Sequence, residues 1–391
     1  MKNDTCKVLT KIKAEKILAR KKCSENLFNE LCDYCTIDAD AAEVLATRNE
    51  KAIRFNSLKS LSDLAAFQLA KHKGHLDLGT GIVLSESAAE LLAKHKGTLS
   101  VSISNKFSDQ ALANIVKHRN LNLEIYSSSL SESRCSALSQ QQGGCLTLVI
   151  STISPQALRI LINTRADEVR LSSQFIWLSE ETSRILNLFQ GHRLSLSLDP
   201  DKNGVVSPEI VDLLSRVRTA HYAEIWFVNL KEITLNLAQI IAQKHGGRAC
   251  LHRVLEIDFE IAQALSKLNA ELILGEAGSF SQCYASDEAV RVLAGNLPGG
   301  SLEFWELSLT DATCEALAKF AGEVCFSGAS LCDDWRDRME DSRGYMKISE
   351  NGARLLVNRQ SITLPKKRLS KAVREIFAEA GCWQGDDWTR R

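Results

Sequence analysis

Residues 61–83 read LSDLAAFQLAKHKGHLDLGTGIV and residues 84–106 read LSESAAELLAKHKGTLSVSISNK, so two successive blocks of equal length share most of their pattern. Both begin with Leu-Ser-acid, contain an Ala-Ala pair and reach Leu-Ala-Lys-His-Lys-Gly before an alternating segment. Self-similarity at a fixed period, here about 23 residues, is the signature of a repeat architecture. The sequence therefore predicts one small structural unit that is built many times over.

Each block predicts a helix followed by a short strand. Ser62 has the side chain of a helix N-cap, and the acidic Asp63 after it suits the positive end of the helix dipole. Gly74 is predicted to end the helix, with basic residues in the last turn before it. Leu76-Asp77-Leu78 alternates apolar and polar side chains, which predicts a strand with its leucines in the core and Asp77 outside.

The pattern continues on both sides of this pair of blocks. Equivalent starts are found at Leu9, Ile37, Phe107, Leu130, Ile153, Leu178, Val206, Ile233, Ile257, Ala285 and Leu309. About thirteen units of roughly 23 to 28 residues are therefore expected within residues 1–327. One such unit cannot bury its own apolar face, so neighbours must stack. We expect an α/β solenoid with a curved parallel sheet on the concave side and helices on the convex side.

Over residues 9–327 the chain resembles the leucine-rich-repeat superfamily, and specifically an Ala-rich bacterial variant with helices like AAELLAKHKG. The resemblance is most specific between residues 58 and 104. It implies a leucine-rich-repeat-like sheet whose concave surface is available to a partner. The chain departs from the family consensus because it lacks a regular Asn after each strand, where the family forms an internal asparagine ladder.

Residues 328–391 leave the repeat pattern, and we expect a C-terminal cap or a small ββα module that covers the end of the stack. Short strands are predicted at 345–348, 354–357 and 361–364, with Asn351-Gly352 as a hairpin turn. Leu369 to Ala380 reads as an amphipathic helix. The basic run Pro365–Lys371 could contact an acidic partner or nucleic acid, although a solvated surface is the simpler interpretation.

Composition narrows the classes of function. Lys plus Arg and Asp plus Glu both number 48, so no general attraction to nucleic acid or to anionic membranes is indicated. No window reaches the ~18 continuous apolar residues of a membrane span, and the N-terminus lacks the apolar core of a signal peptide. We expect a cytoplasmic protein whose twelve cysteines remain thiols.

Side chains between and after the core residues of each strand are the candidates for binding. In order they are Asp77, Ser100, Asn122, Glu124, Thr147, Arg170, Ser195, Trp226, Ile273, Glu303, Trp305 and Cys325. Trp226 and Trp305 are aromatic residues of the kind enriched in binding hot spots, and Arg170 and Glu303 are predicted as polar anchors. The alternative is a register shifted by one residue, which would place these side chains in the core.

The segment 199–209 resembles a calcium loop, with Asp199, Asp201, Asn203 and Glu209 as candidate oxygen ligands around Gly204. Glu209 lies one position short of the expected bidentate acid, because position twelve of the loop is Ile210. A polar turn followed by Ser207 as a helix cap explains the same residues. Calcium therefore remains an alternative, and no cofactor is expected.

Cys32-x-x-Cys35, together with Cys6 and Cys23, could supply four zinc thiolates, but only one Cys-x-x-Cys pair is present where structural zinc sites usually have two. Gly79-Thr80-Gly81 is predicted as a turn rather than a dinucleotide loop. The recurring histidines are predicted as helix-end residues rather than ligands: His72, His95, His118 and His245.

The sequence therefore favours a non-enzymatic scaffold that binds another protein, of unknown identity, through the concave sheet. One alternative is a structural repeat protein whose C-terminal basic module binds the partner or nucleic acid. The other is a calcium- or zinc-binding protein. No catalytic motif stands out.

Overall fold

The computed structural model describes most of the chain: residues 7–19, 31–47, 52–104, 106–173, 179–189, 193–198, 200, 203–217, 222–227, 230–243, 245–251, 254–274, 283–305, 308–327, 347–357, 362–364, 369–380 and 388–390. The chain divides into two compact units, Met1–Ser195 and Leu196–Arg391, which we call unit 1 and unit 2. The predicted boundary between residues 327 and 328 stays a prediction, because residues 328–346 lie outside the described residues.

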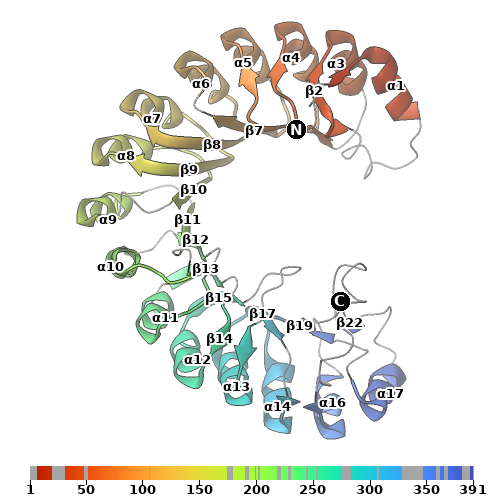
Figure 1. Ribbon diagram of the computed structural model, residues 1–391, viewed down its shortest axis with the longest axis vertical. Coiled ribbons are helices and arrows are strands. Elements are labelled where there is room, and N and C mark those ends of the chain that lie inside the picture. The colour runs from red at the N-terminus through yellow and green to blue at the C-terminus, as the bar shows by residue number, and fades with distance from the viewer. Residues whose placement is uncertain are drawn as a thin grey trace. The chain divides into compact units, whose positions relative to one another are not determined.

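Unit 1 alternates short helices and strands along the chain (Figure 1). Its helices are α1 (Lys11–Ala19), α3 (Ala39–Ala46), α4 (Asp63–Leu69), α5 (Glu86–Leu92), α6 (Asp109–Ile115), α7 (Glu132–Leu138), α8 (Pro155–Leu161) and α9 (Glu180–Leu186). Its strands are β1 (Lys7–Leu9), β2 (Tyr34–Ile37), β3 (Ala52–Arg54), β4 (Ser60–Leu61), β5 (His75–Thr80), β6 (Val83–Leu84), β7 (Leu99–Ser104), β8 (Leu121–Leu130), β9 (Cys145–Ile153) and β10 (Glu168–Ser173). The strand β11 (Arg193–Leu198) contains the division between the units.

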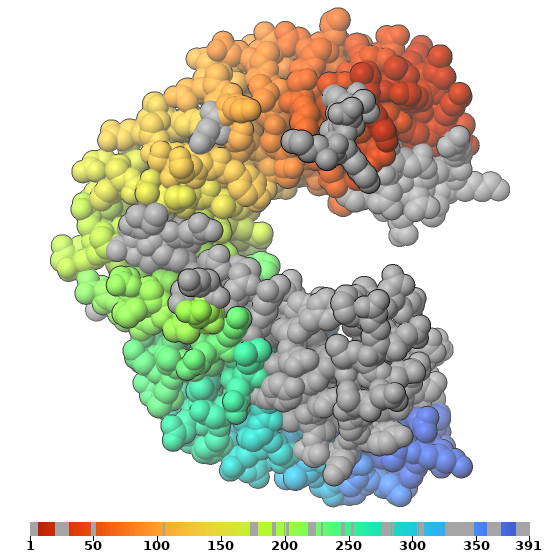
Figure 2. Space-filling model, viewed as in Figure 1, coloured from red at the N-terminus to blue at the C-terminus, as the bar shows by residue number. Residues whose placement is uncertain are grey.

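The long strands of unit 1 pair in chain order. β3, β5, β7, β8, β9 and β10 are successive neighbours, and every pair is parallel. The helices between them lie on one side of these strands (Figure 1). The predicted α/β class with a parallel sheet is therefore confirmed. Consecutive helix–strand units pack closely against one another along the unit (Figure 2).

Unit 2 follows the same order of elements. Its helices are α10 (Pro208–Arg216), α11 (Leu235–Ala242), α12 (Phe259–Leu265), α13 (Asp287–Asn296), α14 (Asp311–Lys319), α16 (Glu350–Leu356) and α17 (Lys371–Glu379). Its strands are β12 (Tyr222–Phe227), β13 (His245–Leu251), β14 (Glu256–Ile257), β15 (Asn269–Leu274), β16 (Tyr284–Ala285), β17 (Gly300–Trp305), β18 (Ser308–Leu309), β19 (Glu323–Ser327), β20 (Lys347–Ile348), β21 (Ile362–Leu364) and β22 (Trp388–Arg390). β12, β13, β15, β17, β19 and β21 pair in parallel, and β22 is antiparallel to β21.

Helix N-caps recur with the period seen in the sequence. Ser62, Ser85, Ser108, Ser131 and Ser154 are evenly spaced along the chain, and each side chain accepts a hydrogen bond from the backbone N–H three positions later. This contact satisfies one of the backbone donors left open at a helix start. The predicted caps are confirmed, and they fix where each helix begins.

The predicted helix end at Gly74 is wrong. α4 ends at Leu69 with Ala70 as its C-cap, and the next N–H groups make tighter bonds to the third residue back. The N–H of Lys71 donates to the Gln68 carbonyl at 3.1 Å. A last turn of this 3₁₀ type closes the helix without a glycine, so Lys71 and the two residues after it follow the helix instead of ending it.

The core of unit 1 is built by alternation in the strands and by small residues in the helices. Leu76 and Leu78 are fully buried while Asp77 between them is partly exposed, as predicted. Ala65 and Ala66 are also fully buried, because small side chains let neighbouring helices approach closely.

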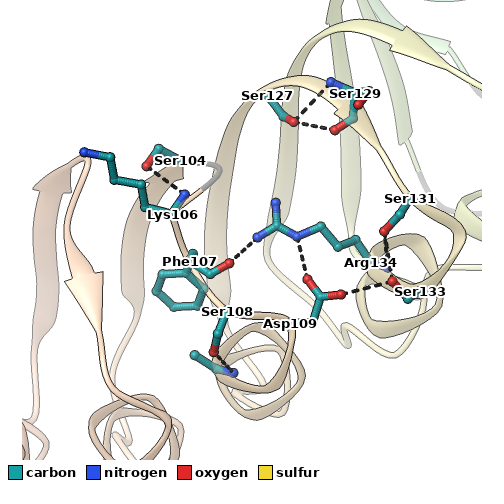
Figure 3. Close-up of polar contacts among 11 residues, drawn as sticks. Ser104, Lys106, Phe107, Ser108, Asp109, Ser127, Ser129, Ser131, Ser133 and Arg134 are labelled. Carbon is teal, nitrogen blue, oxygen red and sulfur yellow. Dashed lines mark hydrogen bonds and ion pairs between the residues drawn. The ribbon is translucent and has the colours of Figure 1, made fainter.

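An arginine clip joins two helices of unit 1, and the sequence pattern did not predict it. Arg134 of α7 is 9% exposed; its Nε donates to Asp109 Oδ1 of α6 at 2.9 Å and its Nη2 donates to the Phe107 carbonyl (Figure 3). Ser133 donates to the other Asp109 oxygen at 3.0 Å. The position holds alanine in the two most regular blocks, so the clip is specific to this pair of helices.

The hairpin predicted at Asn351-Gly352 is also wrong, as is the strand predicted at 354–357. Both lie in or against α16, which is capped by Ser349 through the Gly352 N–H. Ser349 and Asn351 also donate to Asp311 of α14. These contacts continue the cap pattern of the earlier helices, so residues 350–356 are helical, whereas β20 and β21 lie within the other two predicted strands. The helix predicted from residue 369 is present as α17, with Val373, Ile376 and Phe377 buried.

Candidate functional site

Polar side chains occupy the strand face opposite the helices in unit 1. The strand register places them in two rows across the sheet. Asp77, Ser100 and Asn122 are in register on β5, β7 and β8. Ser102, Glu124, Thr147 and Arg170 form a second row on β7 to β10. We call these seven residues the polar face.

Alternation decides which way the polar face points. The neighbours of these residues along each strand, such as Leu123 and Leu146, are almost fully buried. Glu124 and Thr147 are partly exposed, and Arg170 is exposed. In a strand, successive side chains point to opposite faces. A register shifted by one residue is therefore not seen for these positions.

Hydrogen bonds link Ser100 and Asn122 of the first row to each other and to two residues beside the row. His75 Nε2 and Ser100 Oγ are 2.8 Å apart, and Asn122 Nδ2 donates to Ser100 Oγ at 3.4 Å. The Cys145 N–H donates to Asn122 Oδ1 at 3.2 Å. Burial lowers the pKa of His75, and the charge of Arg54 adds to this effect while Asp77 opposes it. These contacts form a fixed series of donors and acceptors beside Asp77, which itself accepts from the Gly79 N–H at 3.0 Å.

Glu124 is the centre of the second row. Its Oε2 accepts from Ser102 Oγ at 2.6 Å and its Oε1 accepts from Tyr126 Oη at 2.9 Å. Burial and this hydrogen bond to Glu124 raise the pKa of Tyr126 to about 12, so the phenol remains a donor at neutral pH. No ion pair involves Glu124 or Asp77 within the described residues.

Arg170 is held in place at the far end of the same row. Its Nε and Nη2 donate to the two oxygens of Glu168 at 2.8 and 3.2 Å, and Ser195 Oγ donates to Glu168 Oε1 at 2.7 Å. Burial raises the pKa of Glu168, but the hydrogen bonds from Arg170 and Ser195 outweigh it and hold the pKa below its usual value. A two-pronged contact of this kind fixes the direction of the guanidinium.

The polar face surrounds a hollow of about 520 Å³. Its walls are Asn56, Asp77, Gly79, Thr80, Ser100, Val101, Ser102, Asn122, Leu123, Glu124, Cys145, Thr147 and Arg170. Its lining includes the small side chains of Ser100 and Ser102 and the charged side chains of Asp77 on β5 and Arg170 on β10. The hollow can therefore accept polar and charged groups of a partner.

The one thiol in this wall is not activated. Burial raises the pKa of Cys145, although contacts with Thr147 and Arg170 oppose the change. Its sulfur lies 3.6 Å from Thr147 Oγ1. A thiol with a raised pKa is mostly protonated near pH 7 and is a poor nucleophile. The chemistry that this surface supplies is hydrogen bonding and charge.

The four predicted anchors are divided between the two units. Arg170 lines the hollow of unit 1. Trp226 lies on β12 of unit 2, partly exposed between the buried Ile225 and Phe227. Glu303 and Trp305 are in β17, but their side chains lie outside the described residues. In unit 2, Trp226 is in register with Cys250 and Ile273, and Ile273 with Ser301. Trp305 is four positions further along β17, so the two tryptophans do not share a row.

Charged residues surround Trp226 on its face of unit 2. Arg248 Nε donates to Glu271 Oε2 at 2.9 Å, and its Nη1 lies 3.9 Å from Glu224 Oε1. Cys250 Sγ donates to Glu224 Oε1 at 3.1 Å. Burial, followed by this hydrogen bond, raises the pKa of Cys250. The charges on this face are thus paired with one another.

Only two of the four predicted calcium ligands lie within the described residues. Asp199 and Asp201 lie outside the described residues, while Asn203 and Glu209 are exposed. Ser207 caps α10 by accepting from the Ile210 N–H. Hydrogen bonds from the Glu209 backbone N–H and from Ser207 lower the pKa of Glu209. The predicted cap is confirmed, and the calcium set as a whole stays a prediction.

The predicted zinc ligands and the predicted basic run are also described only in part. Cys32 and Cys35 lie before and within β2, while Cys6 and Cys23 lie outside the described residues. Among described residues, no group of three or more His, Cys, Asp or Glu side chains is placed to hold a metal ion. Residues 365–368 of the basic run are outside the described part.

Ser102, Tyr126, Cys145 and Glu168 belong to this site but were missed from the sequence. They lie two positions beyond or before the predicted ones on the same strands, where LSVSIS and LNLEIY continue to alternate. The signal in the sequence for Ser102 and Tyr126 is the alternation of their strands, which continues past the two core residues.

No family model matches the chain, and no curated protein matches it. Within the described residues, no helix has the length and apolar character that crossing a membrane would require.

Proposed function

We propose that the chain is a leucine-rich-repeat-like solenoid that binds another protein through the polar face of unit 1, on the concave side of a curved sheet. The observation that carries the proposal is the pair of in-register polar rows around one hollow. The regular recurrence of the sequence block and of the helix caps supports the repeat assignment. The chain acts as a scaffold, not as an enzyme.

The size of the surface favours a macromolecule over a small ligand. The second row crosses from β7 to β10, and the strands from β3 to β10 together span roughly 24 Å at a spacing near 4.8 Å. A partner segment lying across them would meet Asp77 and Glu124 with donors and Arg170 with an acceptor. Because Glu168 already orients Arg170, little side-chain entropy is lost when a partner binds.

Reversing the charge of Glu124 should weaken the partner complex. We expect Glu124→Lys to raise the Kd roughly 10- to 100-fold, because the side chain loses its acceptors and faces partner donors with a like charge. Glu90→Lys on α5 makes the same change in charge on the helix side of unit 1 and is the matched control. Calorimetric titration with the partner captured on the wild-type chain measures both.

Equal weakening by the two variants would contradict the proposal, since it would make the effect one of net charge. An unchanged Kd for Glu124→Lys, with the fold verified by circular dichroism, would also contradict it. Trp226→Ala distinguishes the surface on unit 2: a selective loss in that variant would move the binding site to β12.

A further inference from the structure

Three histidines form a buried column at the edge of unit 1 where α4, α5 and α6 lead into β5, β7 and β8. His72, His95 and His118 are 1%, 5% and 2% exposed. Neighbouring ring centroids are 6.2 and 5.8 Å apart, and the planes differ by 9° and 20°. The histidines come after the ends of their helices and are buried. Their predicted place at the helix ends did not indicate this burial.

The column continues in neutral polar side chains. Gln141 and Thr164 occupy the same place in the next two repeats and are buried. Gln141 Nε2 donates to the Leu121 carbonyl at 2.9 Å, and Thr164 Oγ1 donates to the Leu138 carbonyl at 3.2 Å. In these two repeats the side chain at this position thus ties its repeat to the backbone of the repeat before it.

His95 makes the same kind of tie. Its Nε2 is 3.0 Å from the Gly74 carbonyl and its Nδ1 is 3.4 Å from the Ala70 carbonyl. Both carbonyls flank His72, in the segment between α4 and β5. His95 therefore holds the entry into β5, which carries Asp77.

His118 can hold its contact only as a neutral ring. Its Nδ1 accepts from the Asn120 N–H at 3.0 Å, so the ring proton is on Nε2. Protonation adds a hydrogen at Nδ1, opposite the N–H that it now accepts. Taking up a proton therefore breaks the contact that leads into β8, the strand of Glu124.

Within the described residues, the charged groups that act on His72 and His118 are other histidines. After the larger effect of burial, His95 and His75 lower the pKa of His72, and His95 lowers the pKa of His118. The residues next to the histidines in sequence are exposed cations: Lys71, Lys73, Lys94, Lys96, Lys117 and Arg119. On the α3 side, residues 48–51 lie outside the described residues. Within the described part, His72 Nδ1 and Nε2 and His118 Nε2 have no hydrogen-bond partner.

We propose that the histidine column is a pH-sensitive latch on the polar face: the neutral rings of His72 and His118 keep β5, β7 and β8 in order, and proton uptake by these two rings loosens the strands. The effect on partner binding rests on the function proposed above, whereas the effect on the strands does not. Mild acidification would then release a partner from unit 1.

The direction of the effect follows from linkage. Burial, then the neighbouring His95, lowers the pKa of His118 from 6.5 to about 4, and burial likewise lowers the pKa of His72. The unfolded chain takes up protons near pH 6.5, whereas folded His118 resists protonation until about pH 4 and the pKa of folded His72 lies below its usual value. The stability contributed by the neutral His118 ring is therefore complete above pH 6.5 and is lost as the pH falls toward 4.

Unit 2 provides an internal comparison. Leu268, Leu297 and Phe320 are buried between a helix and the following strand, in the place that the histidines occupy in unit 1. Apolar side chains do not titrate. Its strands β15 and β17 should therefore keep their order over the same pH range.

Hydrogen exchange of the full-length chain at pH 7.5 and pH 5.0, corrected for intrinsic rates, tests the latch. We expect protection of β5, β7 and β8 to fall at least about tenfold at pH 5.0, and protection of β15 and β17 to change less than about threefold. His118→Gln copies the side chain at position 141 and should reduce the fall in unit 1. An equal fall in both units, or none, would overturn the latch.

If His118→Gln does not fold, titration of the histidine rings by NMR in the wild-type chain still tests the latch. We expect the His118 signals to titrate near pH 4; titration near pH 6.5 with unchanged protection would overturn the proposal. Partner binding is measured separately at the two pH values. Loss of protection with undiminished binding would overturn the link to the polar face, and loss of binding in Glu124→Lys at pH 7.5 tests the proposed function alone.

Discussion

Gly79→Ala is expected to lower the free energy of unfolding of unit 1 by roughly 2–5 kcal/mol. Gly79 has a φ of +73°, and a Cβ at this position would lie 2.1 Å from the Phe55 carbonyl oxygen of the neighbouring chain segment. The atom that it meets belongs to the backbone and cannot rotate away. The Gly79 N–H also donates to Asp77 Oδ1 at 3.0 Å, so the change would disturb the polar face directly.

Gly81→Ala is the matched control, because it separates backbone strain from the steric overlap. Gly81 has nearly the same φ, +75°, and a Cβ there would have no atom within 4 Å. Only the cost of the left-handed conformation remains, about 1–2 kcal/mol. Urea unfolding followed by circular dichroism measures both variants. Equal losses would contradict the close approach of β5 to the segment after β3.

Phe227→Ala is expected to destabilise unit 2 by about 3–5 kcal/mol. Phe227 ends β12 and is fully buried, so its removal leaves a cavity in addition to the lost apolar contact. Hydrogen exchange in β12 and β13 provides a local readout beside the urea midpoint.

Trp226→Ala changes the adjacent residue and is the matched control. Trp226 points to the opposite face of β12 and is partly exposed, so we expect a change of less than about 1 kcal/mol. The contrast tests which face of this strand is the core. A larger loss from Trp226→Ala than from Phe227→Ala would reverse the face and return Trp226 to the interior.

The fold could be predicted where a residue type in a given pattern has a single structural role. A serine before Asp63 or Glu86 caps a helix, and Leu76 and Leu78 around Asp77 form a strand with one buried face. These local rules recur in every regular block, and from them the order of helices and parallel strands follows. They weaken where the period changes, as at Asn351-Gly352, where a dipeptide typical of a turn lies inside α16.

The remaining features depend on contacts between units, which a repeat pattern does not reveal. Arg134 replaces an alanine and becomes a buried clip only because Asp109 lies beside it on the preceding helix. The histidines read as ends of helices, but stacking at 6.2 and 5.8 Å makes them a buried column. In both cases the sequence shows the residue and the neighbouring unit determines its role.

The sequence predicted which polar residues share one strand face, but it did not single them out as the main candidate site. Asp77, Ser100, Asn122, Glu124, Thr147 and Arg170 were expected on one face and line one hollow. Aromatic content had drawn attention to unit 2 instead. The hollow forms where short and long side chains lie side by side in the strand register, such as Ser102 beside Glu124. The sequence of one strand does not show which residues of the next strand pair with it.

The most direct test of the binding surface is site-specific photo-crosslinking. A benzoylphenylalanine is placed at Thr147 on the polar face or at Glu90 on the helix side of the same unit, and the crosslinked partner is measured by mass spectrometry. We predict crosslinking from position 147, little from position 90, and loss of the first product when Glu124→Lys is added. Crosslinking from position 90 and not from position 147 would contradict the account.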